Sequence, residues 1–248
     1  MRLHRFYISE KIGQRADIII SDQELIRQLA NVFRFQTGEK VILFDGSGFE
    51  FEAEIVSWSK KEIKFKILSH FAKAARDVNI SLYLSLIKKN NFEWAAEKCT
   101  EVGVAEIHPV ISERSEKKDL NLERLNKIVK EASEQSGRVT LPKVFEIENL
   151  EKAVTQAVQE GKRGVVFHTN TTSAEHNRPG SPTHHPALTK AGIDGCHQMA
   201  AFIGPEGGFT EKEMAFFKQN NFEILSLGQN VLRAETAAIV AVWSQINN

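Results

Sequence analysis

The chain has 248 residues, which is enough for one large domain or two small ones with a substantial buried core. Lysine plus arginine equals aspartate plus glutamate at 32 each, so contact with a polyanion would have to come from local patches rather than from the total charge. Its apolar runs are shorter than the roughly 18 residues of a membrane helix and its start lacks a signal-peptide pattern, so we expect a cytoplasmic protein without a membrane partner.

The first 72 residues show the pattern of a small antiparallel β domain. Between residues 38 and 69, three runs of partial apolar and polar alternation are separated by the turn segments DGSG and SKKE. The residues expected on the buried faces are Phe49, Phe51, Ala53, Ile55, Ile63, Phe65 and Ile67. Before them, residues 21–35 carry apolar side chains at helical spacing after a cap at Ser21 or Asp22, which predicts one short helix packed on this unit.

Beyond about residue 75, strands and helices alternate. Strands are predicted at 79–87, 104–111, 164–169, 199–204 and 222–228, and helices at 90–102, 121–136, 148–160, 210–220 and 233–247. Trp94, Val102 and Val104 are expected in the core. This order predicts an α/β domain with a mostly parallel, helix-covered sheet, and we place the domains at 1–72 and 73–248. Residues 170–198 are polar and rich in Pro, Gly and His, which predicts a flexible insertion or a lid.

The segment FIGPEGGFT, residues 202–210, leads from a strand directly into a glycine-rich bend. Glycines at 204, 207 and 208 permit positive φ and let a ligand approach the main chain without meeting a Cβ. The following TEKE predicts a capping box, with Thr210 as N-cap and Glu213 at the third helical position. Neither GK[ST] nor GxGxxG is present, so phosphate binding is not the first choice, and a purely structural turn is the alternative.

A second segment, LGQNVLRAETA at 227–237, again leaves a strand through a glycine and enters a helix. Arg233 stands in the first turn of that helix, where a cation opposes the helix dipole, and this unfavourable placement indicates a functional role. The alternatives are a solvated side chain or a salt bridge to Glu235.

These two segments, together with EKCTEVGVAEIHPV, EASEQSGR and the initial RLHRFY, closely resemble the bacterial 16S ribosomal RNA uridine-N3 methyltransferase family of the SPOUT superfamily. The resemblance covers nearly the whole chain. It implies an N-terminal PUA-like β-barrel for RNA, a C-terminal parallel sheet with helices on both faces and a trefoil knot, and a homodimer that acts on 16S ribosomal RNA or the small ribosomal subunit. It also implies that S-adenosylmethionine lies against the main chain of the two bends. The matching positions are Ile203, Gly204, Gly207, Gly208, Leu227, Gly228, Leu232, Arg233 and Thr236.

Methylation of uridine N3 requires an unpaired or flipped-out base and removal of the N3 proton. Our catalytic candidates are Arg138 and Arg233, to stabilise the developing anion, and Glu134 or Glu206, to accept the proton. The alternative for Glu134 is an ordinary solvated helix residue, and that for Glu206 is a turn residue bonded to nearby amides.

The RNA contacts are expected in local basic and aromatic groups. The candidates are Arg2, His4, Arg5 and Tyr7 at the start, Lys88 and Lys89 at a strand-to-helix turn, and Arg138. We expect Phe6 to pack in the core, and Arg114, Lys117 and Lys118 to lie in a solvated loop because acids are interleaved with them.

No metal is expected, since Cys99, Cys196 and the histidines at 168, 176, 184, 185 and 197 lack ligand spacing.

Two positions depart from the family pattern, which usually has a basic residue where Asn230 stands and threonine where Ala234 stands.

The alternatives to a uridine-N3 enzyme are a SPOUT methyltransferase acting on another RNA or on a ribose hydroxyl, and a non-catalytic RNA-binding ribosome-assembly factor. A nucleotide-dependent metabolic enzyme would need a phosphate-binding lysine or a ribose-binding acid, and neither is evident.

Overall fold

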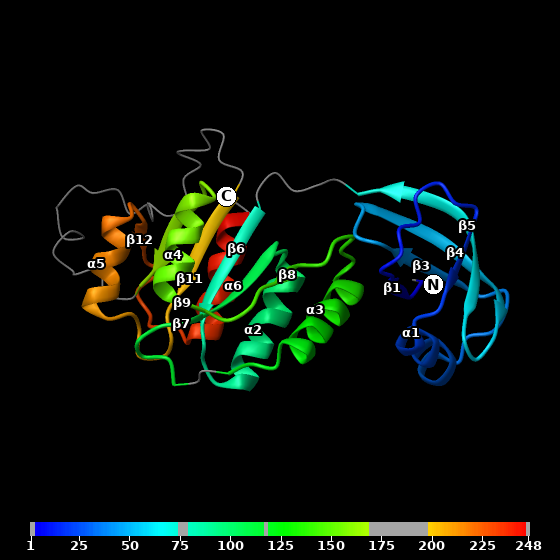
Figure 1. Ribbon diagram of the computed structural model, residues 1–248, viewed down its shortest axis with the longest axis horizontal. Coiled ribbons are helices and arrows are strands. Elements are labelled where there is room, and N and C mark those ends of the chain that lie inside the picture. The colour runs from blue at the N-terminus through cyan, green and yellow to red at the C-terminus, as the bar shows by residue number, and fades with distance from the viewer. Residues whose placement is uncertain (1–2, 74–78, 117–118, 169–197, 247–248) are drawn as a thin grey trace. The chain divides into compact units, whose positions relative to one another are not determined.

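The computed structural model describes residues 3–73, 79–116, 119–168 and 198–246 (Figure 1). The chain forms two compact units, one from residues 1–75 with 133–141 and the other from residues 76–132 with 142–248. Each unit has its own hydrophobic core. The predicted insertion at 170–198 lies, except for its last residue, outside the described residues.

The first unit is built on a five-stranded sheet in the order β1-β3-β4-β5-β2. Its strands are β1 (Arg5–Tyr7), β2 (Asp17–Ile20), β3 (Lys40–Phe44), β4 (Phe49–Trp58) and β5 (Ile63–Ala72). β1 runs parallel to β3, and the other pairs are antiparallel. The period-two pattern accounts for most of β4 and β5, because Phe51, Ala53, Ile55, Ile63 and Phe65 are buried, as predicted. Ile67 is half-buried, and the prediction was wrong for Phe49, which is 38% exposed at the first position of β4.

The helix expected within 21–35 forms as two short pieces. α1 (Gln23–Arg27) begins after Asp22, whose carboxylate accepts hydrogen bonds from two backbone N–H groups of the first turn. It continues directly into η1 (Gln28–Phe33), a π-helical segment that ends at Arg34 with a φ of 56°. The cap residue was therefore predictable, whereas nothing in the apolar spacing indicates the wider π turn.

The second unit contains a parallel sheet in the order β12-β10-β11-β6-β7-β8, with β9 paired to β7. Its strands are β6 (Asn79–Ser85), β7 (Glu106–Ile111), β8 (Lys143–Val144), β9 (Glu148–Asn149), β10 (Arg163–Phe167), β11 (Gln198–Ile203) and β12 (Glu223–Leu225). Its helices are α2 (Lys89–Val102), α3 (Leu122–Ser136), whose last residues belong to the first unit, α4 (Leu150–Gln159), α5 (Glu211–Gln219) and α6 (Ala234–Ile246). All of its strand pairs are parallel, which confirms the predicted fold class.

Helices cover both faces of this sheet. Leu82 and Leu84 of β6 face the cluster that includes α2, α3 and α6, and α2 and α6 also pack against each other. Tyr83, between them in the strand, faces the opposite cluster that includes α4 and α5. Among the described helices, none has the length and apolar character needed to span a bilayer. The trefoil knot is not tested by the described residues and stays a prediction.

The strand order determines which loops become neighbours. β11 lies between β10 and β6, with Ile203 opposite Phe167 of β10 and Leu84 of β6. In parallel strands the C-terminal ends share one edge of the sheet, and ligands of α/β folds bind at that edge. The bend after β11, the loop after β12 and the turn after β6 therefore all leave from the same edge.

Candidate active site

A cavity of about 720 Å³ opens at this edge of the parallel sheet. Its volume falls within the range of roughly 300–1,000 Å³ that is typical of small-molecule sites. The predicted site residues in its walls are Ile203, Gly204, Glu206, Gly207, Gly208, Leu232 and Arg233. A smaller adjoining cavity of about 40 Å³ shares Leu232 and adds Leu227, Gly228 and Asn230. The structure thus brings the two glycine-containing segments together, and their binding of a cofactor remains a prediction.

The first bend needs glycine for local reasons. Gly208 has a φ of +67°, and its N–H donates to the carbonyl oxygen of Pro205 at 2.8 Å, which closes a tight turn. A Cβ on Gly204 would lie 3.3 Å from both the ring and the backbone nitrogen of Phe209. At these glycines the cavity wall consists of main chain without a Cβ, which leaves peptide groups accessible to a ligand.

The helix that follows this bend is fixed by the predicted capping box. The N–H of Glu213 donates to Oγ1 of Thr210 at 3.3 Å, and the N–H of Thr210 donates to Oε2 of Glu213 at 2.8 Å. α5 therefore starts at a defined residue immediately after the glycines.

Arg233, which follows the second bend, is exposed to the cavity. Gly228 has a φ of +130°, and its N–H and carbonyl both contact the hydroxyl of Ser226, at 3.3 and 2.9 Å. Arg233 is exposed at the cavity, and its side chain has no hydrogen bond or ion pair within the described part of the chain. The alternative salt bridge to Glu235 is not found among the described residues: Glu235 is buried, and its Oε2 has no hydrogen-bond partner there. Ala234 lines the larger cavity.

Two wall residues were missed by the sequence analysis. Arg114 is exposed, as expected for a solvated loop, but its Nη1 donates to the carbonyl oxygen of Gly207 at 2.7 Å. His168 follows β10, and burial, with a further contribution from the positive charge of Arg114, lowers the pKa of its imidazole. A histidine directly after an apolar strand was a usable signal, whereas the contact of Arg114 joins segments 93 positions apart.

Glu134 and Arg138 belong to the first unit, so their catalytic roles stay predictions. Glu134 is 7% exposed, and its Oε1 accepts a hydrogen bond from the N–H of Tyr7 at 3.0 Å. The Nε of Arg138 donates to the carbonyl oxygen of Thr140 at 3.2 Å. Thr236, which was also expected at the cofactor, is partly buried and lies outside the walls described for both cavities.

The RNA-contact candidates at the start of the chain are partly engaged within the first unit. Nη1 of Arg5 donates to Glu50 Oε1 at 2.6 Å, and its side chain is only 8% exposed. The ring of His4 lies 4.5 Å from that of Phe33, and Tyr7 is half-buried. Phe6 is buried, as predicted, and Arg2 lies outside the described residues.

The predictions for α2 and the residues that flank it were partly right and partly wrong. Lys88 and Lys89 are exposed where β6 turns into α2, with Nζ of Lys89 3.9 Å from a carboxylate oxygen of Glu93. Val104 is buried as predicted, but Trp94 is 44% exposed and the prediction that it lies in the core was wrong. The buried face of α2 repeats at helical spacing, and Trp94 falls off that face: the buried residues are Phe92, Glu93, Ala95, Ala96, Cys99 and Thr100.

In the described part of the chain, no three His, Cys, Asp or Glu side chains gather as a metal site. Cys99 is buried. Cys196 and the histidines at 176, 184, 185 and 197 lie outside the described residues.

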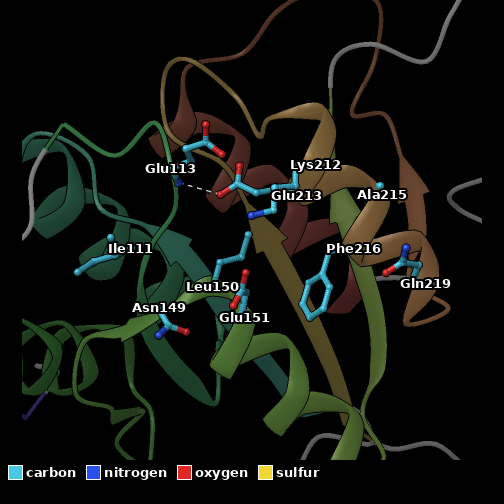
Figure 2. Close-up of a pocket in the computed structure, with 10 residues that line it drawn as sticks. All are labelled: Ile111, Glu113, Asn149, Leu150, Glu151, Lys212, Glu213, Ala215, Phe216 and Gln219. Atoms are coloured by element: carbon cyan, nitrogen blue, oxygen red, sulfur yellow. Dashed lines mark hydrogen bonds between the residues drawn. The ribbon is translucent and has the colours of Figure 1, made fainter.

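A second cavity of about 460 Å³ lies between the end of β7, the start of α4 and α5. Figure 2 shows its lining, which consists of Ile111, Glu113, Asn149, Leu150, Glu151, Lys212, Glu213, Ala215, Phe216 and Gln219. No predicted site residue lines it. Glu113 and Glu213 on its wall are joined by a hydrogen bond, and Arg114 of the first cavity is the next residue along the chain.

Comparison with known proteins gives matches over nearly the whole chain. Residues 74–245 match the family model for an RNA methyltransferase domain, and residues 22–68 match that for an RNA methyltransferase PUA domain. The ribosomal RNA small subunit methyltransferase E of Rickettsia conorii is 29% identical over 244 residues, which cover 98% of this chain and 94% of that protein.

Two solved structures are also similar to this chain over nearly its whole length. The ribosomal RNA small subunit methyltransferase E of Neisseria gonorrhoeae, bound to S-adenosyl methionine, is 28% identical with a TM-score of 0.79, over 97% of this chain and 95% of that one. A methyltransferase of Legionella pneumophila, in complex with the same cofactor, is 29% identical with a TM-score of 0.78, over 98% and 96% of the two chains. With a PUA unit before a parallel sheet and two glycine bends at adjoining cavities of that sheet, this chain belongs to the RNA methyltransferase family that its motifs resemble.

Proposed function

We propose that the protein transfers a methyl group from S-adenosylmethionine to N3 of a uridine in the 16S ribosomal RNA of the small subunit. The observation that carries this proposal is that both glycine bends line adjoining cavities at one sheet edge. Relatives named as small-subunit ribosomal RNA methyltransferases support the substrate, and solved neighbours with bound S-adenosylmethionine support the cofactor. Such a substrate places the reaction in the cytoplasm.

The residues of the cavity suit this cofactor. Gly204, Gly207 and Gly208 carry no side chain of their own into the cavity wall, and we expect their peptide groups to hold the adenosyl and methionyl parts. Ile203 and Leu232 supply apolar contact from the two different loops. We expect these residues, with Leu227, Gly228 and Arg233, to hold the cofactor. Thr236 is less well supported, because it lies outside the cavity walls.

When bound, S-adenosylmethionine supplies a sulfonium methyl group, which bonds to uridine N3 as the proton leaves N3 and the carbon–sulfur electron pair stays on sulfur. The protein must hold the base unpaired, orient N3 and remove its proton. Arg233, exposed at the cavity, is placed to stabilise negative charge that develops on the uridine. Arg138 remains a second candidate for that role.

Among the proton acceptors, the geometry favours Glu206. It is exposed in the cavity wall and has no side-chain hydrogen bond or ion pair among the described residues. Glu134 is buried and already accepts a backbone hydrogen bond. His168 offers a further acceptor, because its lowered pKa keeps the imidazole neutral at neutral pH.

The cofactor and the base can be tested on the full chain. Calorimetric titration with S-adenosylmethionine should show one site per chain. With the cofactor saturating, we expect Glu206→Gln to lower kcat by about 100-fold or more, which is the range of general-base catalysis. Glu134→Gln is the matched comparison and should keep a larger share of turnover. Full turnover by Glu206→Gln would show that this carboxylate is not the base.

Lys88 and Lys89 are our best-supported RNA contacts. Both are exposed, and the turn that carries them leaves the same sheet edge as the cavity. Replacing both with glutamine should weaken RNA binding uniformly and reduce the slope of log affinity against log salt by about 1.4–1.8, since each phosphate contact contributes roughly 0.7–0.9. An unchanged slope would remove them from the interface. The roles of Arg2, His4, Arg5, Tyr7 and Arg138 in RNA binding remain proposals of the same kind.

A homodimer is also proposed, with the second copy seated on α2 and α6. Trp94 on α2 and Trp243 on α6 are 44% and 57% exposed, on two helices that pack against each other. Large exposed aromatic side chains are characteristic of interfaces. Light scattering should give a dimer mass, and Trp243→Glu should give a monomer. Val158→Glu is the control, because Val158 is 45% exposed on α4. A wild-type monomer would contradict the proposal.

Two other functions make different predictions. A ribosome-assembly factor without catalysis would bind small subunits but transfer no methyl group from S-adenosylmethionine. A methyltransferase for another RNA would transfer it, but not to small-subunit ribosomal RNA.

A further inference from the structure

The loop after β7 is attached to the first glycine bend through Arg114. Its Nη1 donates to the carbonyl oxygen of Gly207 at 2.7 Å. A Cβ added to Gly207 would lie 3.3 Å from Cδ of Arg114, so the stem of the arginine runs along this glycine. Arg114 is thereby a wall residue of the large cavity although it comes from a different loop.

A carboxylate holds this loop in place. Oε1 of Glu213 accepts a hydrogen bond from the N–H of Glu113 at 2.8 Å, which Figure 2 shows as a dashed line. Oε2 of Glu213 accepts the N–H of Thr210 in the capping box, also at 2.8 Å. The hydroxyl of Thr210 in turn donates to Oε2 of Glu113 at 3.2 Å. We call Glu113, Thr210 and Glu213 the Glu213 clip. It joins the start of α5 to the residue that precedes Arg114.

The guanidinium of Arg114 has donors to spare. Arginine carries five N–H donors in a planar fork, and the bond to Gly207 is the only side-chain hydrogen bond of Arg114 within the described residues. A guanidinium in a cavity wall with free donors is suited to a carboxylate or phosphate oxygen. The positive charge of Arg114 also acts on another wall residue, because it contributes to the lowered pKa of His168.

We propose that Arg114 binds the carboxylate of the cofactor's amino-acid part, and that Glu213 is the positioning residue that holds Arg114 at the cavity. The carboxylate is favoured over an RNA phosphate because Arg114 is seated on Gly207, in the bend that we expect to hold the cofactor. This inference rests on the proposed function, from which the cofactor comes.

Two nucleosides distinguish this contact from a general effect on the cavity. S-adenosylhomocysteine contains the amino-acid carboxylate, and 5′-methylthioadenosine lacks the whole amino-acid part. By calorimetry on the full chain, Arg114→Ala should weaken S-adenosylhomocysteine about 10- to 100-fold, the loss expected for a charged hydrogen bond, and leave methylthioadenosine within about twofold. Arg114→Lys should recover part of the loss. Glu151→Gln is the control, since Glu151 lines only the second cavity and should change neither affinity.

Each contrary result has its own meaning. Equal losses for both nucleosides would make Arg114 a purely structural residue, and no loss for either would remove it from the site. A loss of RNA affinity with unchanged S-adenosylhomocysteine binding would assign Arg114 to a phosphate and overturn the inference. If wild-type protein binds neither nucleoside, the proposed cofactor fails, and the inference fails with it.

A double-mutant cycle tests the clip. Gln at 213 keeps one oxygen, so it cannot accept both N–H groups that Glu213 serves. We expect Glu213→Gln to weaken S-adenosylhomocysteine in the wild-type background and to have little further effect in the Arg114→Ala background. Additive losses would show that Glu213 does not act through Arg114.

Discussion

Replacement of Gly208 by alanine tests the backbone geometry on which the large cavity depends. An added Cβ would meet its nearest atom, Cε1 of His168, at 3.6 Å, which is an ordinary contact. A steric clash therefore does not lower the free energy of unfolding. The expected loss of about 1–2 kcal/mol comes from holding an L residue at a φ of +67°. Gly208→Asn should cost less, because asparagine tolerates left-handed backbone. Gly207→Ala requires only a small shift of the flexible Arg114 side chain and should cost under about 0.5 kcal/mol.

Urea unfolding followed by far-ultraviolet circular dichroism measures these differences in the free energy of unfolding. In a thermal melt of a chain of this size, each 1 kcal/mol corresponds to roughly 2–4 °C, so Gly208→Ala should lower Tm by roughly 2–8 °C. The reasoning would be refuted if Gly208→Ala were as stable as wild type, or if asparagine at this position cost as much as alanine.

Three further predictions concern the second unit. Gly164→Ala places a Cβ 2.4 Å from ring carbons of Phe222 and should destabilise by about 1–3 kcal/mol, with Phe222→Leu recovering part of the loss in urea titrations. The side chain of His108, with further hydrogen bonds, holds the pKa of Glu106 well below its ordinary value. That stabilisation is complete above the ordinary carboxyl pKa and is lost as pH falls below about 4.5, so Glu106→Gln should flatten the decline of unfolding free energy with acid. Burial raises the pKa of the Cys99 thiol, so alkylation mapped by mass spectrometry should modify Cys99 only after denaturation, and labelling of the native protein would contradict its burial.

Much of the second unit could be predicted, because its signals are local. The helix expected at 90–102 is found at Lys89–Val102 and ends at Gly103 with a φ of 126°. The capping box at Thr210 forms with the expected partners. Strand period and glycine placement also sufficed to select both bends, since parallel strands bring their C-terminal ends to one edge.

The remaining features depend on contacts between distant segments. The return of residues 133–141 to the first unit, where Glu134 bonds to the N–H of Tyr7, has no local signal. The acids around Arg114 correctly indicated exposure but concealed its bond to Gly207. The sequence analysis expects Trp94 in the core, whereas the helical period of its neighbours places it on the exposed side of α2.

The central claim is that the two glycine bends hold a methyl donor for uridine N3 of small-subunit ribosomal RNA. The most direct test incubates the full chain and S-adenosylmethionine carrying an isotopically labelled methyl group with small ribosomal subunits that lack the modification, then analyses the nucleosides by mass spectrometry. We predict labelled 3-methyluridine at one position of the 16S ribosomal RNA. Label in a different nucleoside, or none in RNA with the cofactor bound, would contradict the claim.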